Sequence, residues 1–300
     1  MDDTHPPAAA IRDCIAPDRH PRAPSFALPK GAIDAHVHIF EDRYTLTPVR
    51  DYNPPASTLA DLVALHETLG FERVVFTQPS VYGTDNSAIM EGMAHLNAAT
   101  PGRARAIVAA APDITEDEIA ALDAAGARGV RLNADNRGGM AMGFDDIPTL
   151  EAKLAPFGWH IEFLIPGNAI VELMPVFRAL KVPMSLAHFA FQPAAAGVDA
   201  PGFQALLSLV REGNTFVKIS AANRVSATDL PPYDDLSPMA EALVAADASR
   251  IMWGSDWPHP NKFEVNPNDG DLVDAFGDWV RDPALRQSIL VDVPAAFYRF

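Results

Sequence analysis

Asp34-Ala35-His36-Val37-His38 lies inside an apolar run, residues 32–40, that the pattern predicts to be the first buried strand of the fold. Side chains two residues apart on a strand point to the same face, so His36 and His38 project together with Asp34 one step below them. Two imidazoles that converge on one point suit a metal ion, a polarised carbonyl or a developing oxyanion. Two satisfied polar residues near a strand end would give the same short pattern, so the assignment depends on the rest of the chain.

The composition narrows the class of protein. A chain of 300 residues that is 48% hydrophobic and 21% charged can build one large core or two modest ones. The net charge of −16 argues against nucleic acid as a partner, although arginines gathered in a cleft could still bind an anionic substrate. Cys14 is the single cysteine, so no disulfide framework exists. The lack of a membrane-length apolar run or signal-peptide pattern favours a cytoplasmic protein without a membrane partner; the sequence indicates no oligomeric state.

Short apolar runs alternate with amphipathic segments from residue 31 onward, which predicts a single (β/α)8 TIM barrel over residues 31–300. An open doubly wound sheet is the alternative, but no Gly-x-Gly-x-x-Gly follows a strand. Residues 1–30 are rich in proline and are expected to form a mobile N-terminal arm. The expected strands are 33–38, 74–78, 106–110, 129–133, 160–164, 184–188, 215–219 and 251–255. The expected helices are 58–69, 115–125, 147–157, 169–180, 202–212 and 239–246.

Polar residues concentrate at the ends of the expected strands. In a barrel of this kind the site lies at the carboxyl ends of the strands, so these residues should meet at one mouth. A random scatter of histidines would not follow the strand ends. In chain order the strand ends carry His36 and His38, residues 78–86, Arg131 and Asn133, Arg137, His188, Ser220, Asn223 and Arg224, and residues 253–259.

Three motifs of the chain resemble those of the amidohydrolase superfamily: Asp34 to His38, Ala187-His188-Phe189, and Trp253-Gly254-Ser255-Asp256-Trp257-Pro258-His259. More narrowly, the chain resembles the 2-pyrone-4,6-dicarboxylate lactonase group, which also holds sugar-acid and muconolactone-type lactonases. The resemblance runs from about residue 26 to the C-terminus. Its most specific parts are Leu28-Pro29-Lys30-Gly31, Gln78-Pro79-Ser80-Val81-Tyr82-Gly83-Thr84-Asp85-Asn86 and the last of the three motifs.

The resemblance implies hydrolysis of a small carboxylated lactone of the 2-pyrone-4,6-dicarboxylate, muconolactone or aldarolactone type. In that role Asp256 would accept a proton from water and return it to the leaving oxygen. His36, His38 and His188 would polarise the scissile carbonyl and hold its oxyanion. The alternative for Asp256 is a helix N-cap or a loop hydrogen-bonding residue.

Arginines near the strand ends are candidates for binding substrate carboxylates, because a guanidinium matches a carboxylate two-to-two. For any single arginine, an ion pair with one of the many acidic residues is nearly as good an explanation. The candidates are Arg131, Arg137 and Arg224. Hydroxyl contacts are expected from Tyr52, Ser80 and Tyr82, although loop tyrosines often only pack.

The metal-ligand pattern of this chain is incomplete. Binuclear members of the superfamily carry a bridging lysine or acid at the end of strand four and a histidine at the end of strand five, where this chain has Asn133 and residues 162–165, Glu-Phe-Leu-Ile. A single zinc or manganese ion remains conceivable on four ligands. The resembled lactonases work without an essential metal, and nearby arginines would repel one, so the sequence favours catalysis without a cofactor. The four ligands would be His36, His38, His188 and Asp256.

Other readings stay open at this stage. A metal-dependent decarboxylase of the same superfamily uses similar residues but usually needs the missing strand-five histidine. A lactone isomerase would replace water with a substrate hydroxyl. A non-catalytic binding protein would have no need of Asp256 as a base. The resemblance also leads us to expect a tyrosine near the end of strand five, where Leu164 stands, so the exact lactone is left open.

Strand parity predicts one further pair. Glu162 shares a face with His160 and Leu164, and Lys218 shares a face with Ser220. Alternate strands of a barrel contribute to the same interior layer, so an acid and a base from strands five and seven should meet. We expect this pair to be structural or to orient His188.

Overall fold

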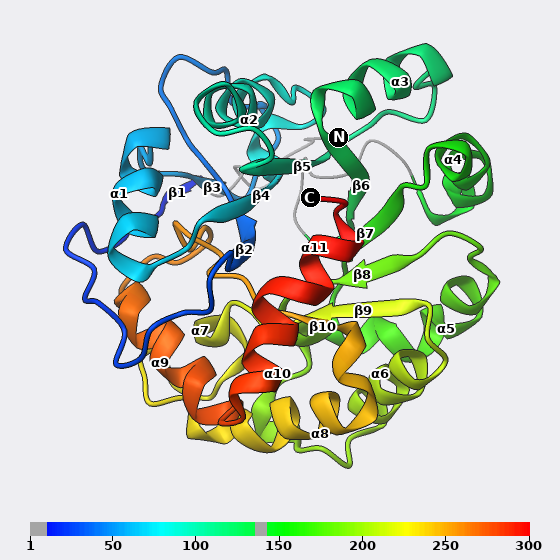
Figure 1. Ribbon diagram of the computed structural model, residues 1–300. Coiled ribbons are helices and arrows are strands. Elements are labelled where there is room, and N and C mark those ends of the chain that lie inside the picture. Colours follow the sequence, from blue (N-terminus) through cyan, green and yellow to red (C-terminus); the bar gives the residue numbers. More distant parts are fainter. Residues whose placement is uncertain (1–10, 136–142) are drawn as a thin grey trace, which may run out of the picture.

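The computed structural model describes residues 11–135 and 143–300 of the chain. Eight parallel strands form one sheet that curves into a nearly closed barrel, in the order β10-β9-β8-β7-β6-β5-β4-β2 (Figure 1). The predicted TIM-barrel fold is therefore confirmed. The strands are β2 Ile33–Val37, β4 Arg73–Thr77, β5 Ala104–Val108, β6 Ala127–Asn133, β7 His160–Leu164, β8 Met184–Leu186, β9 Thr215–Lys218 and β10 Ile251–Met252.

The seam between the first and last strands is closed by the chain that follows β10. Ala35 N–H donates to Trp253 O at 3.1 Å, and His38 N–H donates to Trp257 O at 2.8 Å. Val37 and Trp257 form a parallel bridge. The segment expected as a strand over 251–255 is regular only at Ile251–Met252, because its continuation bends to pair with β2.

Helices surround the barrel in Figure 1. Thr58 and Thr115 begin two of them with capping boxes, as their sequences predict. The helix Ser87–Ala99 was not predicted, although its buried residues Ile89, Met93 and Leu96 follow a helical spacing. The helices are α1 Leu59–Leu69, α2 Ser87–Ala99, α3 Glu116–Ala125, α4 Ile147–Leu154, α5 Ile170–Ala179, α6 Pro201–Arg211, α7 Ala222–Val225, α8 Ser237–Asp247, α9 Asp269–Trp279, α10 Pro283–Gln287 and α11 Val293–Phe297.

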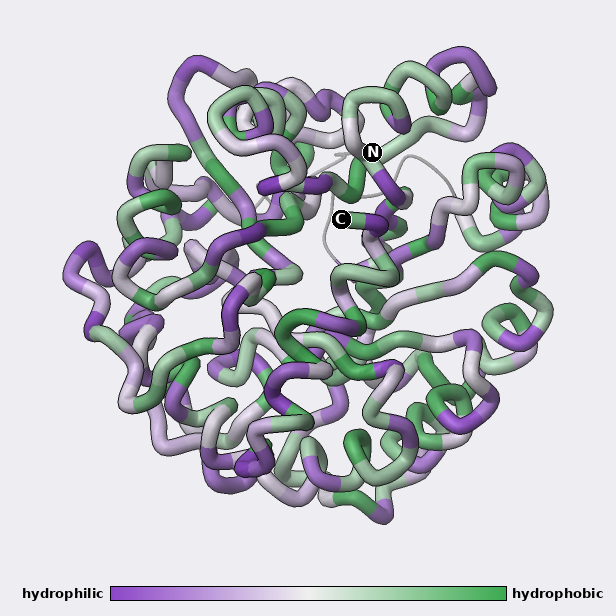
Figure 2. Tube along the Cα trace, in the orientation of Figure 1, coloured by the Kyte–Doolittle hydropathy of each residue, from purple (hydrophilic) through white to green (hydrophobic). Residues whose placement is uncertain are grey.

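The C-terminal segment covers one end of the barrel, where α11 runs across the strands in Figure 1. Val293 and Tyr298 pack in a separate apolar cluster with residues of the strands, among them Ile33, Val75 and Ile107. Hydrophilic stretches are frequent along the outer edge of the ring in Figure 2. Because this end is filled by side chains, a substrate must enter at the opposite, carboxyl end of the strands.

The N-terminal segment differs from the expected mobile arm over its described part, residues 11–30. Strand β1 (Arg12–Asp13) pairs in parallel with β3 (Tyr52–Asn53). Further along, the backbone N–H of Ser25 donates to Asp274 Oδ1 at 2.7 Å on α9. The sequence of this segment shows no periodicity, but strand pairing and side-chain acceptors on the barrel fix it in place.

Within residues 11–135 and 143–300, no helix is long and apolar enough to cross a membrane.

Candidate active site

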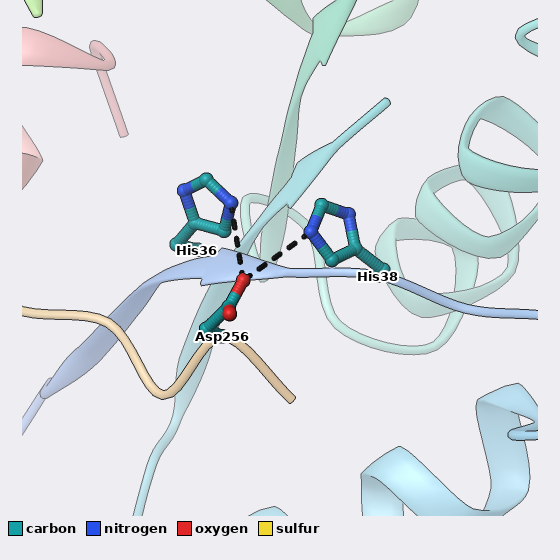
Figure 3. Close-up of side chains that lie close together, drawn as sticks. All are labelled: His36, His38 and Asp256. Atoms are coloured by element: carbon teal, nitrogen blue, oxygen red, sulfur yellow. Dashed lines mark ion pairs between the residues drawn. The ribbon is translucent and has the colours of Figure 1, made fainter. Parts of the chain in front are cut away.

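Four of the predicted residues meet at the carboxyl end of the barrel. His36 lies in β2 and His38 directly follows it, while His188 follows β8 and Asp256 follows β10. All four side chains are buried. The Nε2 atoms of His36, His38 and His188 lie 3.6, 3.5 and 3.5 Å from the same atom, Asp256 Oδ1. Figure 3 shows the rings of His36 and His38 directed toward this carboxylate.

The backbone around Asp256 is held by the first strand. Asp256 has a left-handed φ of 61°, a conformation that an ordinary side chain adopts only under constraint from its surroundings. Ser255 N–H donates to Asp34 Oδ1 at 2.9 Å, so the carboxylate of the opening motif anchors this loop. The other oxygen of Asp34 lies 3.3 Å from His66 Nε2. His66 lies in α1 and is buried, so this contact joins the helix to the first strand.

Charge is distributed unevenly among the four residues. Burial lowers the pKa of His36 and of His188 well below the ordinary value, which keeps both rings neutral at neutral pH. Burial would raise the pKa of Asp256, but His188, His38 and Arg224 outweigh it and hold that pKa below the usual range. The site therefore presents the neutral imidazoles of His36 and His188 beside one ionised carboxylate.

Two of the predicted arginines lie near this carboxylate. Arg224, in α7, places Nη1 4.0 Å from Asp256 Oδ2 and its guanidinium 4.7 Å from the centroid of the Phe191 ring. Arg131, in β6, is buried, and its Nη1 donates to Gln78 O at 2.8 Å. Arg224 keeps 12% of its side chain exposed, so it can meet a ligand that enters the mouth. Arg137 lies outside the described residues.

Of the three predicted hydroxyl groups, Tyr52 and Ser80 lie side by side, whereas Tyr82 makes a different contact. Tyr52 is buried, and its phenol lies beside Ser80 within the electrostatic reach of Arg131. Burial raises the pKa of Tyr52, so its hydroxyl stays protonated and can donate. Tyr82 instead accepts a hydrogen bond from the backbone N–H of Glu41 at 3.2 Å. That contact fits the packing alternative for Tyr82.

The structure adds polar groups that were not singled out as contacts from the sequence. Asn223 is buried one position before Arg224, and neither atom of its amide has a hydrogen-bond partner among the described residues. Such a group is costly to bury unless something binds it. The position of Asn223 next to Arg224, just after a strand end, is the sequence feature from which this contact could have been predicted.

The predicted pair of Glu162 and Lys218 forms as a buried ion pair. One of its two expected roles was to orient His188, but the pair does not contact that ring. Lys218 Nζ is 3.3 Å from His36 Nδ1 instead, and His188 Nδ1 is 2.8 Å from Ser220 Oγ. The pair therefore supports the histidine of the first strand.

The donor atoms at the mouth fit a single divalent cation in type and spacing. One ligand atom from each of His36, His38 and Asp256 lies within 4.8 Å of the others. The Nε2 atom of His188 and both oxygens of Asp256 have no hydrogen-bond partner among the described residues. Imidazole nitrogens with a carboxylate oxygen suit zinc or manganese.

Residues 33–300 match the amidohydrolase family. This chain belongs to the amidohydrolase family. The match covers the whole barrel, including β2 at its start and α11 at its end. The resemblance inferred from the motifs is thereby confirmed.

Relatives within the family agree with the narrower resemblance. The chain is 34% identical to a 4-sulfomuconolactone hydrolase of Hydrogenophaga intermedia, over 95% of this chain and 94% of the relative. It is 33% identical to a 2-pyrone-4,6-dicarboxylate hydrolase of Comamonas testosteroni, over 93% of each chain. A crystal structure of a probable 2-pyrone-4,6-dicarboxylic acid hydrolase from Acinetobacter baumannii, with citric acid bound, superposes with a TM-score of 0.78 at 25% identity, covering 90% of this chain and 100% of that one.

Proposed function

We propose that this chain is a hydrolase that opens a small carboxylated lactone of the 2-pyrone-4,6-dicarboxylate, muconolactone or aldarolactone type. The observation that carries the proposal is the convergence of three Nε2 atoms on one oxygen of an ionised Asp256 (3.6, 3.5 and 3.5 Å), with Arg224 4.0 Å from the other oxygen. The names of the relatives, which are lactone hydrolases, support the same class of reaction.

Asp256 is the general base of the proposed reaction. A water molecule held by the carboxylate gives up a proton to it as the water oxygen bonds to the lactone carbonyl carbon. The carbonyl becomes a tetrahedral oxyanion facing the imidazoles. When the bond from the carbonyl carbon to the ring oxygen breaks, Asp256 returns the proton to that oxygen, and the product is an open-chain hydroxy acid or its keto form.

Arg224 and Arg131 supply the positive charge that the proposed substrate needs. A carboxylate of the lactone is expected to pair with Arg224, whose planar fork matches it two-to-two. Binding has a second effect, because Arg224 is one of the groups that lower the pKa of Asp256. A substrate carboxylate would offset that charge and raise the pKa of Asp256, making it a stronger base when substrate is present.

The proposed reaction needs no metal. If a divalent ion bound, His36, His38, His188 and Asp256 would hold it, and it would supply Lewis-acid polarisation of the carbonyl. The two guanidinium groups near the same carboxylate, those of Arg224 and Arg131, oppose the binding of a metal cation there. We therefore assign the polarisation of the carbonyl to the protein's own side chains.

The test is turnover of a lactone panel before and after exhaustive chelation, with metal content measured on the same samples. The proposal expects ring opening of a carboxylated lactone at an undiminished rate after chelation, with one ¹⁸O atom from labelled water in the product. Ring rearrangement without ¹⁸O uptake would replace it with the isomerase. Activity that disappears on chelation and returns with zinc or manganese would replace the metal-free mechanism, and loss of carbon dioxide would favour the decarboxylase.

A further inference from the structure

Each histidine of the site has its Nδ1 atom beside a different kind of neighbour. A neutral imidazole carries one N–H, so the partner of Nδ1 decides whether Nε2 presents a hydrogen or a lone pair to the substrate. The three contacts are His36 Nδ1 to Lys218 Nζ at 3.3 Å, His38 Nδ1 to Thr77 O at 2.7 Å and His188 Nδ1 to Ser220 Oγ at 2.8 Å.

The first two neighbours impose opposite tautomers. A backbone carbonyl oxygen can only accept, so His38 must carry its hydrogen on Nδ1, and its Nε2 is bare when the ring is neutral. An ammonium group can only donate, so His36 must accept at Nδ1 and carry its hydrogen on Nε2. That hydrogen points into the site, where His36 Nε2 lies 3.6 Å from Asp256 Oδ1.

Lys218 is placed beneath His36 by its other contacts. It forms an ion pair with Glu162, and both side chains are fully buried. Ser185 Oγ donates to the same oxygen of Glu162 at 3.4 Å. On its remaining side, Lys218 Nζ is 5.6 Å from the centroid of the Tyr298 ring. Glu162 Oε1 is 3.8 Å from His36 Nδ1, beyond hydrogen-bond distance, so the ammonium is the nearer partner of that ring.

We propose that Lys218, held by Glu162, fixes His36 as the tautomer with its hydrogen on Nε2, which makes His36 the hydrogen-bond donor to the substrate carbonyl and a poor ligand for a divalent cation. Lys218 and Glu162 are thus positioning residues that act through His36. The assignment of the carbonyl as the acceptor rests on the proposed lactone hydrolysis, whereas the assignment of the tautomer does not.

The second half of the proposal follows from the way histidine binds metals. A histidine that ligates through Nε2 carries its hydrogen on Nδ1 and usually donates it to a carboxylate or a backbone carbonyl. His38 has that arrangement with Thr77 O. At His36 the hydrogen would be directed at the ammonium of Lys218, so metal binding there requires the ion pair to rearrange.

The direct test is a nuclear magnetic resonance measurement of wild-type protein labelled with ¹⁵N at histidine and freed of metal by chelation. Long-range ¹H–¹⁵N correlations distinguish a protonated ring nitrogen from a bare one, and a His36→Asn variant identifies the signals of His36. We expect His36 to be protonated at Nε2 and His38 at Nδ1. A hydrogen on Nδ1 of His36 overturns the proposal. The experiment involves no turnover, so its result is independent of whether any lactone is hydrolysed.

The matching variant is Lys218→Met combined with Glu162→Gln, which removes the cation together with the carboxylate that pairs with it. Arg131, whose Nε lies 3.6 Å from Glu162 Oε1, loses that partner but keeps its hydrogen bond to Gln78 O. We expect the hydrogen of His36 to move to Nδ1, zinc affinity in a calorimetric titration to rise about 10- to 100-fold, and kcat of the metal-free protein to fall while KM changes little. The single variant Lys218→Arg, which keeps Glu162 and a donor at position 218, should show the wild-type tautomer of His36. A double variant that folds with the His36 tautomer and zinc affinity unchanged leaves Lys218 a purely structural residue and overturns the proposal.

Discussion

The backbone N–H of Asp256 donates a hydrogen bond to the carbonyl oxygen of His36 at 2.9 Å. This contact joins the loop after β10, the last strand of the sheet, to β2, the first, so the same bond helps to close the barrel and places the carboxylate against the first histidine. The arrangement of the site is therefore coupled to the closure of the fold. Changes at the seam should affect activity and stability together.

Replacing Gly254 by alanine tests that coupling. A Cβ atom at Gly254 would lie 2.7 Å from both the backbone nitrogen and the Cβ of His36, and contacts this short force backbone to move. We expect Gly254→Ala to lower the free energy of unfolding by about 1–3 kcal/mol and to lower kcat, because His36 is displaced from Asp256. Denaturant unfolding and initial rates of lactone hydrolysis measure the two effects.

Gly143→Ala is the control for the Gly254 variant. Among the described residues, its new Cβ would meet nothing nearer than Asp146 Oδ2 at 4.0 Å, and its φ of −92° suits any residue. Both its stability and its rate should match those of the wild type. If Gly254→Ala were as active and as stable as Gly143→Ala, the seam would not control the geometry of the site.

Asp256→Asn tests the proposed base. Asparagine keeps the shape of the side chain but cannot take a proton from water, so kcat should fall about 10²- to 10⁴-fold. Substrate binding should change far less, because the arginines remain in place. Initial rates give kcat, and calorimetry with a slowly turned-over lactone gives the binding constant. A variant with the wild-type kcat would exclude Asp256 as the base.

Arg224→Met tests the proposed carboxylate contact. Methionine keeps most of the apolar stem that packs near Phe191 but removes the charge. A hydrogen bond to a charged group contributes about 1.5–3 kcal/mol, so we expect KM to rise roughly 10- to 100-fold. Arg178→Met is the control, because Arg178 is exposed and pairs with Glu212 at 2.7 Å. Equal effects of the two substitutions on KM would contradict the assignment.

The parts of the site that could be predicted from the sequence depend on local geometry. The two-residue period of a strand places His36 and His38 on one face wherever the strand lies. The expected strand 160–164 agrees with β7, His160–Leu164. Strand parity likewise anticipated that Glu162 and Lys218 meet. In each case the argument needed only the repeat of the element and the rule that a barrel places strand ends together.

The remaining features depend on how distant elements pack. The contact of Lys218 with His36 joins residues 182 positions apart. The sequence indicated His188 as the ring that the pair could orient, and the structure places the pair beside His36 instead. The burial of His66 against Asp34 depends on where α1 packs on the barrel, which the residues of the helix alone do not determine. The N-terminal segment is ordered over 11–30 by partners such as Asp274, which its own composition does not reveal.

His160 predicts a pH dependence of stability that arises far from the mouth of the barrel. Its buried ring packs 4.4 Å from the ring of Phe297, between centroids, and burial lowers its pKa from 6.5 to about 3. Between these two values the unfolded chain binds a proton at this residue that the folded chain does not bind. The stability that depends on a neutral His160 is therefore fully present above pH 6.5 and is lost as the pH falls toward 3.

The measurement is the free energy of unfolding across this pH range for wild type and His160→Gln, whose side chain cannot be charged. The wild-type curve should fall more steeply on acidification, by at most about 1.4 kcal/mol per pH unit for one proton. The carboxylates that titrate over the same range are common to both proteins, so the difference between the curves isolates His160. His95→Gln on the exposed face of α2 controls for the loss of one histidine. Parallel curves for wild type and His160→Gln would show that the folded protein accommodates a charged ring at this position.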